Sequence, residues 1–334
     1  MSARQPESPG PQATSARPAA DLDFGPLGFG SASIGNLYRA VDDDHVDRAL
    51  EAAWDSGIRY FDTAPHYGLG LSERRLGAFL RERPRDEYLV STKVGRLLAP
   101  NPAFAGGRDD QGFDVPDDAV RVFDPSEAGV RKSLEDSLER MGLDAIDILY
   151  LHDPDVYDLD RGLTEALPAL AKLRDEGLVR AIGIGVNDAA VAARAVREGD
   201  LDLVMIAGRY TLLEQPAAEE LLPVCLERGV RVVDAAVFNS GLLATNTPSA
   251  DASYNYGTVP ADVLARAREL AAVCAEFGVD LPAAALQFPL RHPAVATVVV
   301  GTSNADAVRQ NVQRANAPIP DALWDALTAR GLIA

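Results

Sequence analysis

Length, composition and charge exclude several classes of protein. The chain has 334 residues, 47% of them hydrophobic, which suits one α/β barrel with insertions. Its formal net charge of −18 argues against nonspecific binding to nucleic acid or to an anionic membrane surface. No apolar run approaches the roughly 20 residues that a membrane span needs.

The two cysteines and the amino-terminal segment give further information on how the chain is organised. Cys225 and Cys274 lie in amphipathic helical patterns without metal-ligand spacing, so we expect buried, inert thiols and no metal site. Residues 1–20 are rich in Ser, Pro, Ala and Gln, and they predict a disordered tail before a single domain over 21–334. The tail does not resemble a secretion signal, and cytoplasm is the expected location.

The predicted elements alternate between strand and helix along the chain. Apolar, β-branched runs bounded by turn residues predict strands at 27–35, up to 62, and at 88–93, 146–151, 180–185, 203–207, 230–237 and 296–300. Helical spacing predicts helices at 42–56, 72–81 (with Ser72 as N-cap), 126–140, 163–175, 188–198, 216–228, 260–277, 282–291, 304–315 and 320–330.

Eight strands, each followed by a helix, predict a (β/α)8 TIM barrel with an extra C-terminal helix. An open doubly wound sheet is the alternative. We disfavour it because the residues suited to chemistry are spread over several strand ends and do not cluster at one switch point. A long loop follows the third strand, and its aromatics Phe104, Phe113 and Phe123 favour a lid over a ligand.

Three predicted strands end in ionisable residues. RYFDTAPHYGLG carries Asp62 and Tyr67, EYLVSTKVG carries Lys93, and AIDILYLHDP carries His152. The carboxyl ends of parallel strands meet at one face of an α/β fold, so these four side chains are candidates for one site. The glycines of the first strand, in LGFGSASIG, do not have the spacing of a dinucleotide fingerprint.

The four residue types suit proton transfer at an oxygen atom. A tyrosine hydroxyl titrates near 10, and a neighbouring ammonium group lowers that pKa by stabilising the phenolate. A carboxylate beside the lysine offsets the cost of burying its charge, and a histidine can orient the substrate oxygen or share the proton. The set fits moving a proton on and off a carbonyl or hydroxyl oxygen while a cofactor handles hydride.

These motifs, their order, the GIGVN stretch and the late GTSNADAVRQN segment resemble the aldo-keto reductase superfamily over roughly residues 22–330. The resemblance implies Tyr67 as general acid/base, supported by Asp62, Lys93 and His152, with a nicotinamide at the barrel mouth. It also implies a set of cofactor contacts: Gly30, Ser31, Asp62, Asn187, Ser240, Gly241, Leu242, Gly301, Thr302, Ser303 and Asn311.

The sequence departs from the superfamily pattern at several cofactor positions. Ala207 stands where many relatives carry glutamine, and Ala235 where they stack a tyrosine. Gly301 and Ala307 stand where NADP-selective relatives place cationic residues. A phosphate dianion is poorly held without cations, so we expect NAD, while Arg309 keeps NADP open.

Within the superfamily the chain is most similar to the D-threo-aldose 1-dehydrogenase, L-fucose dehydrogenase and pyridoxal 4-dehydrogenase branch. The likeness rests on GFGSASIGNLY, AGRYTLLEQ and the loop after Lys93. It implies NAD(P)-dependent oxidation of the anomeric hydroxyl of an L-fucose-type or D-threo aldose to a lactone. Candidate substrate contacts on the predicted barrel-top loops are His66, Asp155, Tyr157, Arg209 and Asn239.

Other functions stay open at this point. They are pyridoxal 4-dehydrogenase, a general aldehyde or ketone reductase and, more remotely, a non-enzymatic cofactor-sensing subunit, since ion-channel β subunits use the same fold. The expected partner is a small sugar or aldehyde, with no nucleic acid and no membrane. The oligomeric state is not predicted.

Overall fold

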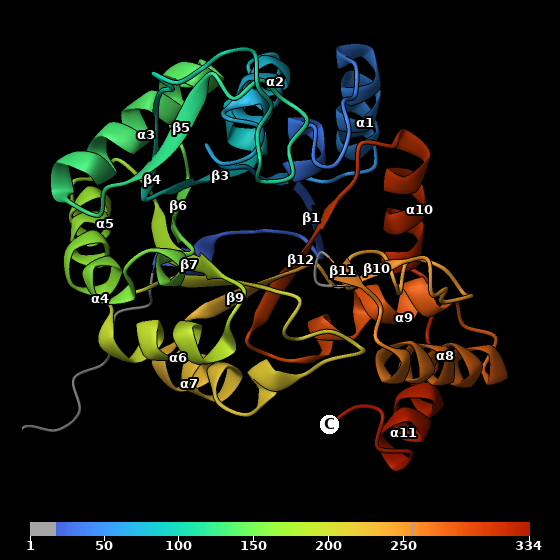
Figure 1. Cartoon of the computed structure of the whole chain (residues 1–334). Coiled ribbons are helices and arrows are strands. Elements are labelled where there is room, and N and C mark those ends of the chain that lie inside the picture. The colour runs from blue at the N-terminus through green and yellow to red at the C-terminus, as the bar shows by residue number, and fades with distance from the viewer. Residues whose placement is uncertain (1–17, 255–256) are drawn as a thin grey trace, which may run out of the picture.

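The computed structural model describes residues 18–254 and 257–334 (Figure 1). In that part of the chain, eight parallel strands close into a barrel in the order β1-β12-β9-β8-β7-β6-β3-β2, which confirms the predicted fold class. The barrel strands are β1 (Leu27–Gly30), β2 (Tyr60–Asp62), β3 (Leu89–Val94), β6 (Ile148–His152), β7 (Ala181–Val186), β8 (Leu203–Ala207), β9 (Arg231–Ala235) and β12 (Val295–Gly301).

Helices surround this barrel, as Figure 1 shows from α1 round to α10. Their apolar faces pack on the strands because the 3.6-residue period gathers apolar side chains on one side. The α-helices are α1 (Asp43–Asp55), α2 (Leu71–Leu80), α3 (Glu127–Met141), α4 (Leu159–Arg161), α5 (Leu167–Asp175), α6 (Ala189–Glu198), α7 (Leu221–Arg228), α8 (Ala261–Glu276), α9 (Leu281–Gln287), α10 (Ala305–Ala315) and α11 (Asp321–Ala329). Short helical turns are η1 (Pro18–Asp21), η2 (Ala32–Gly35), η3 (Arg85–Glu87), η4 (Pro154–Val156), η5 (Gly162–Ala166), η6 (Pro216–Ala218) and η7 (Pro289–Arg291).

The start of α2 differs from the prediction. Ser72 lies inside the helix, and Gly70, with a φ of 81°, precedes it at the cap position. The Ser72 hydroxyl is buried and forms hydrogen bonds with Ser31 (2.8 Å) and Thr63 (2.9 Å). Ser72 therefore joins the ends of β1 and β2 and does not cap the helix.

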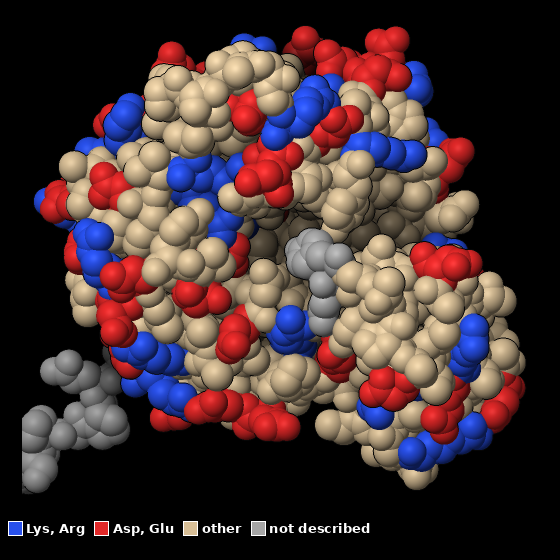
Figure 2. Space-filling view, viewed as in Figure 1, with Lys and Arg blue, Asp and Glu red and all other residues tan. Residues whose placement is uncertain are grey.

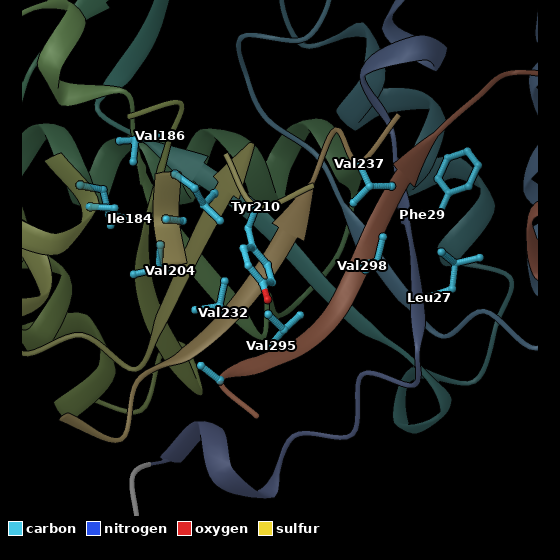
Figure 3. Packing of buried hydrophobic residues seen from close by; sticks show 14 of the residues in the cluster. Leu27, Phe29, Ile184, Val186, Val204, Tyr210, Val232, Val237, Val295 and Val298 are labelled. Atoms are coloured by element: carbon cyan, nitrogen blue, oxygen red, sulfur yellow. The ribbon is translucent and has the colours of Figure 1, made fainter. Parts of the chain in front are cut away.

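Side chains alternate between two hydrophobic layers along the barrel strands. On β6, Ile148 and Tyr150 belong to the cluster inside the barrel, whereas Leu149 and Leu151 belong to the larger cluster beneath the helices. This alternation follows from the period of two in a strand. Figure 3 shows part of the larger cluster, including Val232 on β9.

The amino-terminal end of the barrel is closed by η1 and the segment after it. Phe24 contacts the Tyr60 ring edge to face with 4.9 Å between centroids, and Arg231 donates hydrogen bonds to the carbonyls of Ala19 (2.9 Å) and Leu22 (2.8 Å). The predicted disordered tail is therefore wrong at residues 18–20, because η1 packs a buried Ala19 against the barrel. The rest of the predicted tail, 1–17, lies outside the described residues.

The long connection after β3 has structure of its own. Strands β4 (Arg96–Pro100) and β5 (Ala119–Phe123) pair as an antiparallel hairpin, so the simple loop that we expected is only its tip. The connection between β9 and α8 similarly contains β10 (Ser253–Tyr254) and β11 (Gly257–Thr258).

The described residues also bear on membrane spans, metal sites and the state of the cysteines. None of their helices is both long and apolar enough to cross a membrane. Among them, no three His, Cys, Asp or Glu side chains are grouped to hold a metal ion. Cys225 and Cys274 are buried free thiols, as predicted, and burial raises their pKa values to about 12 and about 11.

Candidate active site

A pocket of about 490 Å³ opens at the carboxyl ends of the barrel strands. All four predicted catalytic residues, Asp62, Tyr67, Lys93 and His152, line it. Figure 2 shows one face of the molecule, hollowed near its centre, with acidic and basic side chains mixed around the hollow. The tertiary structure thus brings together residues that lie up to 90 positions apart.

Asp62 and Lys93 form a buried ion pair at the base of the pocket. Lys93 Nζ lies 2.6 Å from Asp62 Oδ2 and donates a second hydrogen bond of 2.9 Å to the Thr63 carbonyl. The two side chains are 3% and 2% exposed. Ser91, which faces Asp62 in the parallel register of β2 and β3, donates to Asp62 Oδ1 at 2.7 Å. Both oxygens of this buried carboxylate are therefore satisfied.

This pair shifts the proton affinities around it. Burial lowers the pKa of Lys93, but Asp62 and then Tyr67 outweigh it, so the net pKa is raised and the ammonium form is retained. Burial raises the pKa of Asp62, against the effect of Lys93. Because the ammonium is retained, a fixed positive charge lies beneath the pocket.

Tyr67 is held over that charge by a tight turn. The turn begins with Pro65 and passes through Gly68 at a φ of 62°, where an added Cβ would lie 2.2 Å from the Gly35 carbonyl oxygen. Lys93 Nζ lies 4.8 Å from the centre of the Tyr67 ring. Burial raises the pKa of Tyr67, and Lys93 acts in the opposite direction. The phenol and its electrostatic partner therefore share one cavity.

Two neutral histidines adjoin the phenol. The His152 ring meets the Tyr67 ring at 88° with 5.9 Å between centroids, and His66 lies 5.5 Å from His152. Burial, followed by the positive charge of Arg96, lowers the pKa of His66 to about 2 and that of His152 well below its usual value. Nδ1 of each ring has no hydrogen-bond partner among the described residues. Such imidazoles suit hydrogen bonding to a neutral substrate oxygen rather than proton donation as a cation.

Five of the predicted cofactor contacts line the same pocket: Gly30, Ser31, Asp62, Asn187 and Gly301. Gly30 and Gly301 face each other on β1 and β12, where a Cβ on Gly301 would lie 2.9 Å from the Gly30 carbonyl oxygen. The Ser31 hydroxyl donates to the Asp62 carbonyl at 2.6 Å, so it supports the strand ends.

The pocket has the features that a flat, amide-bearing ring requires. Ala207 and Ala235, the departures noted in the sequence, are neighbours on β8 and β9, and their small side chains leave room in the pocket. The Asn187 side chain supplies amide hydrogen-bonding groups at the end of β7. Backbone without Cβ atoms at Gly30 and Gly301 allows close approach. These residues fit a nicotinamide.

The other predicted cofactor contacts lie outside this pocket. Ser240 and Gly241 adopt left-handed conformations, and the Gly241 and Leu242 amides donate within the turn at 3.0 Å and 3.2 Å. In this structure both amides are therefore engaged within the turn. Beyond β12, Ser303 and Asn311 are buried, while the Thr302 hydroxyl accepts from the Asn304 amide at 3.1 Å. Their roles stay predictions.

Of the predicted substrate contacts, only His66 lines the pocket. Tyr157 stacks on Phe123 with 4.9 Å between ring centroids, and Asp155 is exposed on η4. Arg209 donates to the Asn187 carbonyl at 2.8 Å, and Asn239 donates to Glu214 at 3.0 Å. Arg209 therefore contacts the backbone of Asn187, which lines the pocket. Asn239 contacts Glu214, which does not line it.

The structure adds lining residues that sequence reasoning did not select as contacts. The ring centroid of Phe113, at the hairpin tip, lies 5.2 Å from that of His66 and 6.0 Å from that of Tyr67. This position is consistent with the expected role of the segment as a cover over the pocket. Phe104, by contrast, is exposed. Asp153 also lines the pocket, and its place directly after His152 was the available signal. The remaining additions include Leu37, Gln111, Gly185 and Met205.

The fold and the four residues at the barrel mouth agree with the class that the sequence resemblance implies, that of barrel oxidoreductases. The model of the Aldo/keto reductase family matches residues 26–330, and the chain belongs to this family. This confirms the superfamily resemblance.

Curated relatives indicate which branch of the family the chain is most similar to. The chain is 55% identical to D-threo-aldose 1-dehydrogenase from a Pseudomonas species, over 94% of this chain and 96% of the relative. It is 42% identical to pyridoxal 4-dehydrogenase from Microbacterium luteolum, over 92% and 94%. Among solved structures, an aldo-keto reductase from Bacillus halodurans in its holo form has a TM-score of 0.73 at 27% identity, covering 96% of each chain. The predicted branch is therefore confirmed, and the protein is an aldo-keto reductase family dehydrogenase.

Proposed function

We propose that this enzyme oxidises the anomeric hydroxyl of a cyclic aldose to a lactone, with a nicotinamide cofactor. The observation that carries the proposal is the placement of Tyr67 over the buried Lys93–Asp62 pair, in a pocket that Asn187 also lines. The similarity to D-threo-aldose 1-dehydrogenase supports the substrate class.

In the proposed mechanism Tyr67 takes the proton of the anomeric hydroxyl. Lys93 stabilises the phenolate form, and Asp62 holds Lys93 in place and offsets the cost of its burial. His152 in its neutral form hydrogen-bonds the same substrate oxygen and orients it. When bound along Gly30, Asn187 and Gly301, a nicotinamide would supply the acceptor for the hydride that leaves C1.

We further propose NAD as the preferred cofactor. Arg309, the cation that keeps NADP open in the sequence, is exposed on α10 and pairs with Asp306 at 3.0 Å. A phosphate would have to compete with that carboxylate. Gly301 and Ala307 add no charge.

Pyridoxal is the second candidate substrate, because a pyridoxal 4-dehydrogenase is 42% identical and Phe113 gives the pocket an aromatic wall. One panel separates the candidates: L-fucose, D-arabinose, L-galactose, pyridoxal and simple aldehydes, each with NAD+ and NADP+. We expect the highest kcat/KM for an aldose with NAD+ and a lactone as the product. A higher kcat/KM for pyridoxal than for any aldose would identify pyridoxal as the substrate instead. Cofactor binding without turnover of any compound would support a non-enzymatic role.

A further inference from the structure

Asp153 occupies an unusual position at the edge of the pocket. It follows β6 directly and adopts a left-handed conformation with a φ of 39°, which is uncommon for a residue other than glycine. Its amide donates to the Gly185 carbonyl on β7 at 2.9 Å, which ties the strained residue to the neighbouring strand. Strain of this kind persists only when surrounding contacts hold it, and it gathers at functional sites.

The carboxylate of Asp153 is anchored through one oxygen. Arg96 Nη2 lies 2.6 Å from Oδ2, and the two side chains are 6% and 15% exposed. His152 Nε2 lies 3.4 Å from the same oxygen. None of the hydrogen bonds formed by the described residues engages Oδ1, although Asp153 lines the pocket. One carboxylate oxygen is therefore fixed, while the other has its acceptor capacity left for a ligand.

The groups around Oδ1 define what such a ligand must offer. A carboxylate only accepts hydrogen bonds, and the adjoining imidazoles of His66 and His152 are neutral. Arg96 already balances the negative charge, so a cationic ligand is not required. A hydroxyl group matches these conditions, because it donates to a carboxylate without bringing a charge into the pocket.

We propose that Asp153 selects polyhydroxylated substrates by accepting, through Oδ1, a hydrogen bond from a ring hydroxyl of the aldose. This proposal rests on the proposed function, since it assigns a specificity residue to the same reaction. Arg96 acts as a positioning residue that orients the carboxylate.

The test compares substrates with and without ring hydroxyls in the Asp153→Asn variant. Arg96 retains the carbonyl oxygen of the new amide, so the NH2 group turns to the pocket and the acceptor becomes a donor at nearly constant volume. We expect kcat/KM for the best aldose to fall about 10- to 100-fold, the range for losing a charge-assisted hydrogen bond. Reduction of butanal, which has no hydroxyl group, is expected to fall by less, so the ratio of aldose to butanal kcat/KM is expected to drop.

A neighbouring ion pair provides the matched control. Asp109 and Arg121 are 2.6 Å apart, 4% and 5% exposed, and belong to the hairpin segment near His66, but neither lines the pocket. Asp109→Asn removes a similar buried charge. We expect the ratio of aldose to butanal kcat/KM to stay unchanged in this variant.

Deoxy sugars extend the test to the unmodified enzyme, so it does not depend on the folding of a variant. Removing the hydroxyl that contacts Asp153 is expected to lower wild-type kcat/KM about tenfold or more, and to have little further effect in Asp153→Asn. Equal losses with aldose and butanal would overturn the proposal and indicate a role through His152. Tolerance of every deoxy sugar would overturn it as well. If the wild-type enzyme turns over no aldose, both the proposed function and the role of Asp153 are wrong. If the wild type oxidises aldoses and Asp153→Asn leaves the ratio of aldose to butanal kcat/KM unchanged, only the role of Asp153 is wrong.

Discussion

Buried aspartates lie at both ends of the barrel, and their partners differ. At the amino-terminal end, Asp147 accepts hydrogen bonds from the Val90 amide at 2.9 Å and from Arg85 at 2.8 Å, with Arg180 3.4 Å away. At the mouth, Asp153 has one oxygen bound to Arg96, and Asp62 depends on Lys93 and Ser91.

This difference in hydrogen-bond partners distinguishes an aspartate that stabilises the fold from aspartates that adjoin the active site. Both oxygens of Asp147 are engaged by arginines and backbone, and that end of the barrel is closed by Phe24 and η1. At the mouth, no hydrogen bond of the described residues engages Oδ1 of Asp153, which lines the pocket. A carboxylate with both oxygens engaged, such as Asp147, stabilises the fold, whereas an open acceptor that lines a cavity is available to a ligand.

The largest expected effect at the mouth is that of Tyr67→Phe. Removing the hydroxyl abolishes the proton acceptor, and we expect turnover to fall at least about 100-fold, while nicotinamide binding is kept. Steady-state kinetics and cofactor titration by fluorescence measure the two properties. Turnover equal to wild type would reject Tyr67 as the general base. Tyr88→Phe, at a buried tyrosine that does not line the pocket, is the matched control for loss of a buried phenol.

Lys93→Met comes next and affects both activity and stability. It leaves Asp62 buried without its ion-pair partner, which is expected to cost about 3–5 kcal/mol in the free energy of unfolding. Because Lys93 lowers the pKa of Tyr67, the residual oxidation rate is expected to reach its maximum at higher pH than in wild type. Denaturant unfolding and a pH–rate profile test the two effects, and an unchanged profile would contradict the electrostatic role.

Asp147→Ala probes the closed end of the barrel. The Val90 amide and Arg85 lose their shared acceptor, so we expect the free energy of unfolding to fall by about 2–4 kcal/mol. Because Asp147 is remote from the pocket lining, kcat per folded molecule is expected to match wild type. A loss of kcat without a loss of stability would show that the two ends are not independent.

The last prediction concerns the effect of acid on the stability contributed by neutral His66. The pKa of His66 is lowered by burial to about 2, so between about pH 2 and its ordinary value of about 6.5 the unfolded chain binds a proton that the folded chain does not. Stability from this residue is therefore complete above pH 6.5 and declines on acidification by about 1.4 kcal/mol per pH unit. His66→Gln is expected to reduce the slope by that amount in denaturant titrations at pH 4 to 6. An unaltered slope would indicate that His66 is protonated in the folded state.

Much of the barrel could be predicted from local pattern. The β8 bounds match the prediction at residues 203–207, and the other barrel strands differ by a few residues, because buried parallel strands are continuous apolar runs. The hairpin β4–β5 was missed because its proline- and glycine-rich flanks resemble a loop. Ser72 was assigned as a cap because serine is common there, yet its hydrogen bonds to Ser31 and Thr63 join segments that are distant in sequence.

The amino-acid order by itself determined the alternation of strand and helix and the residues that end each strand, since apolar periodicity and turn chemistry are local properties. It also indicated that Asp62, Tyr67, Lys93 and His152 share one site, because parallel strands end at one face. Only the tertiary structure decided which of their neighbours join them. The αL turn of Asp153, its bond to Arg96, and the exclusion of Tyr157 and Asn239 depend on contacts between segments far apart in the chain, and no local pattern encodes those distances.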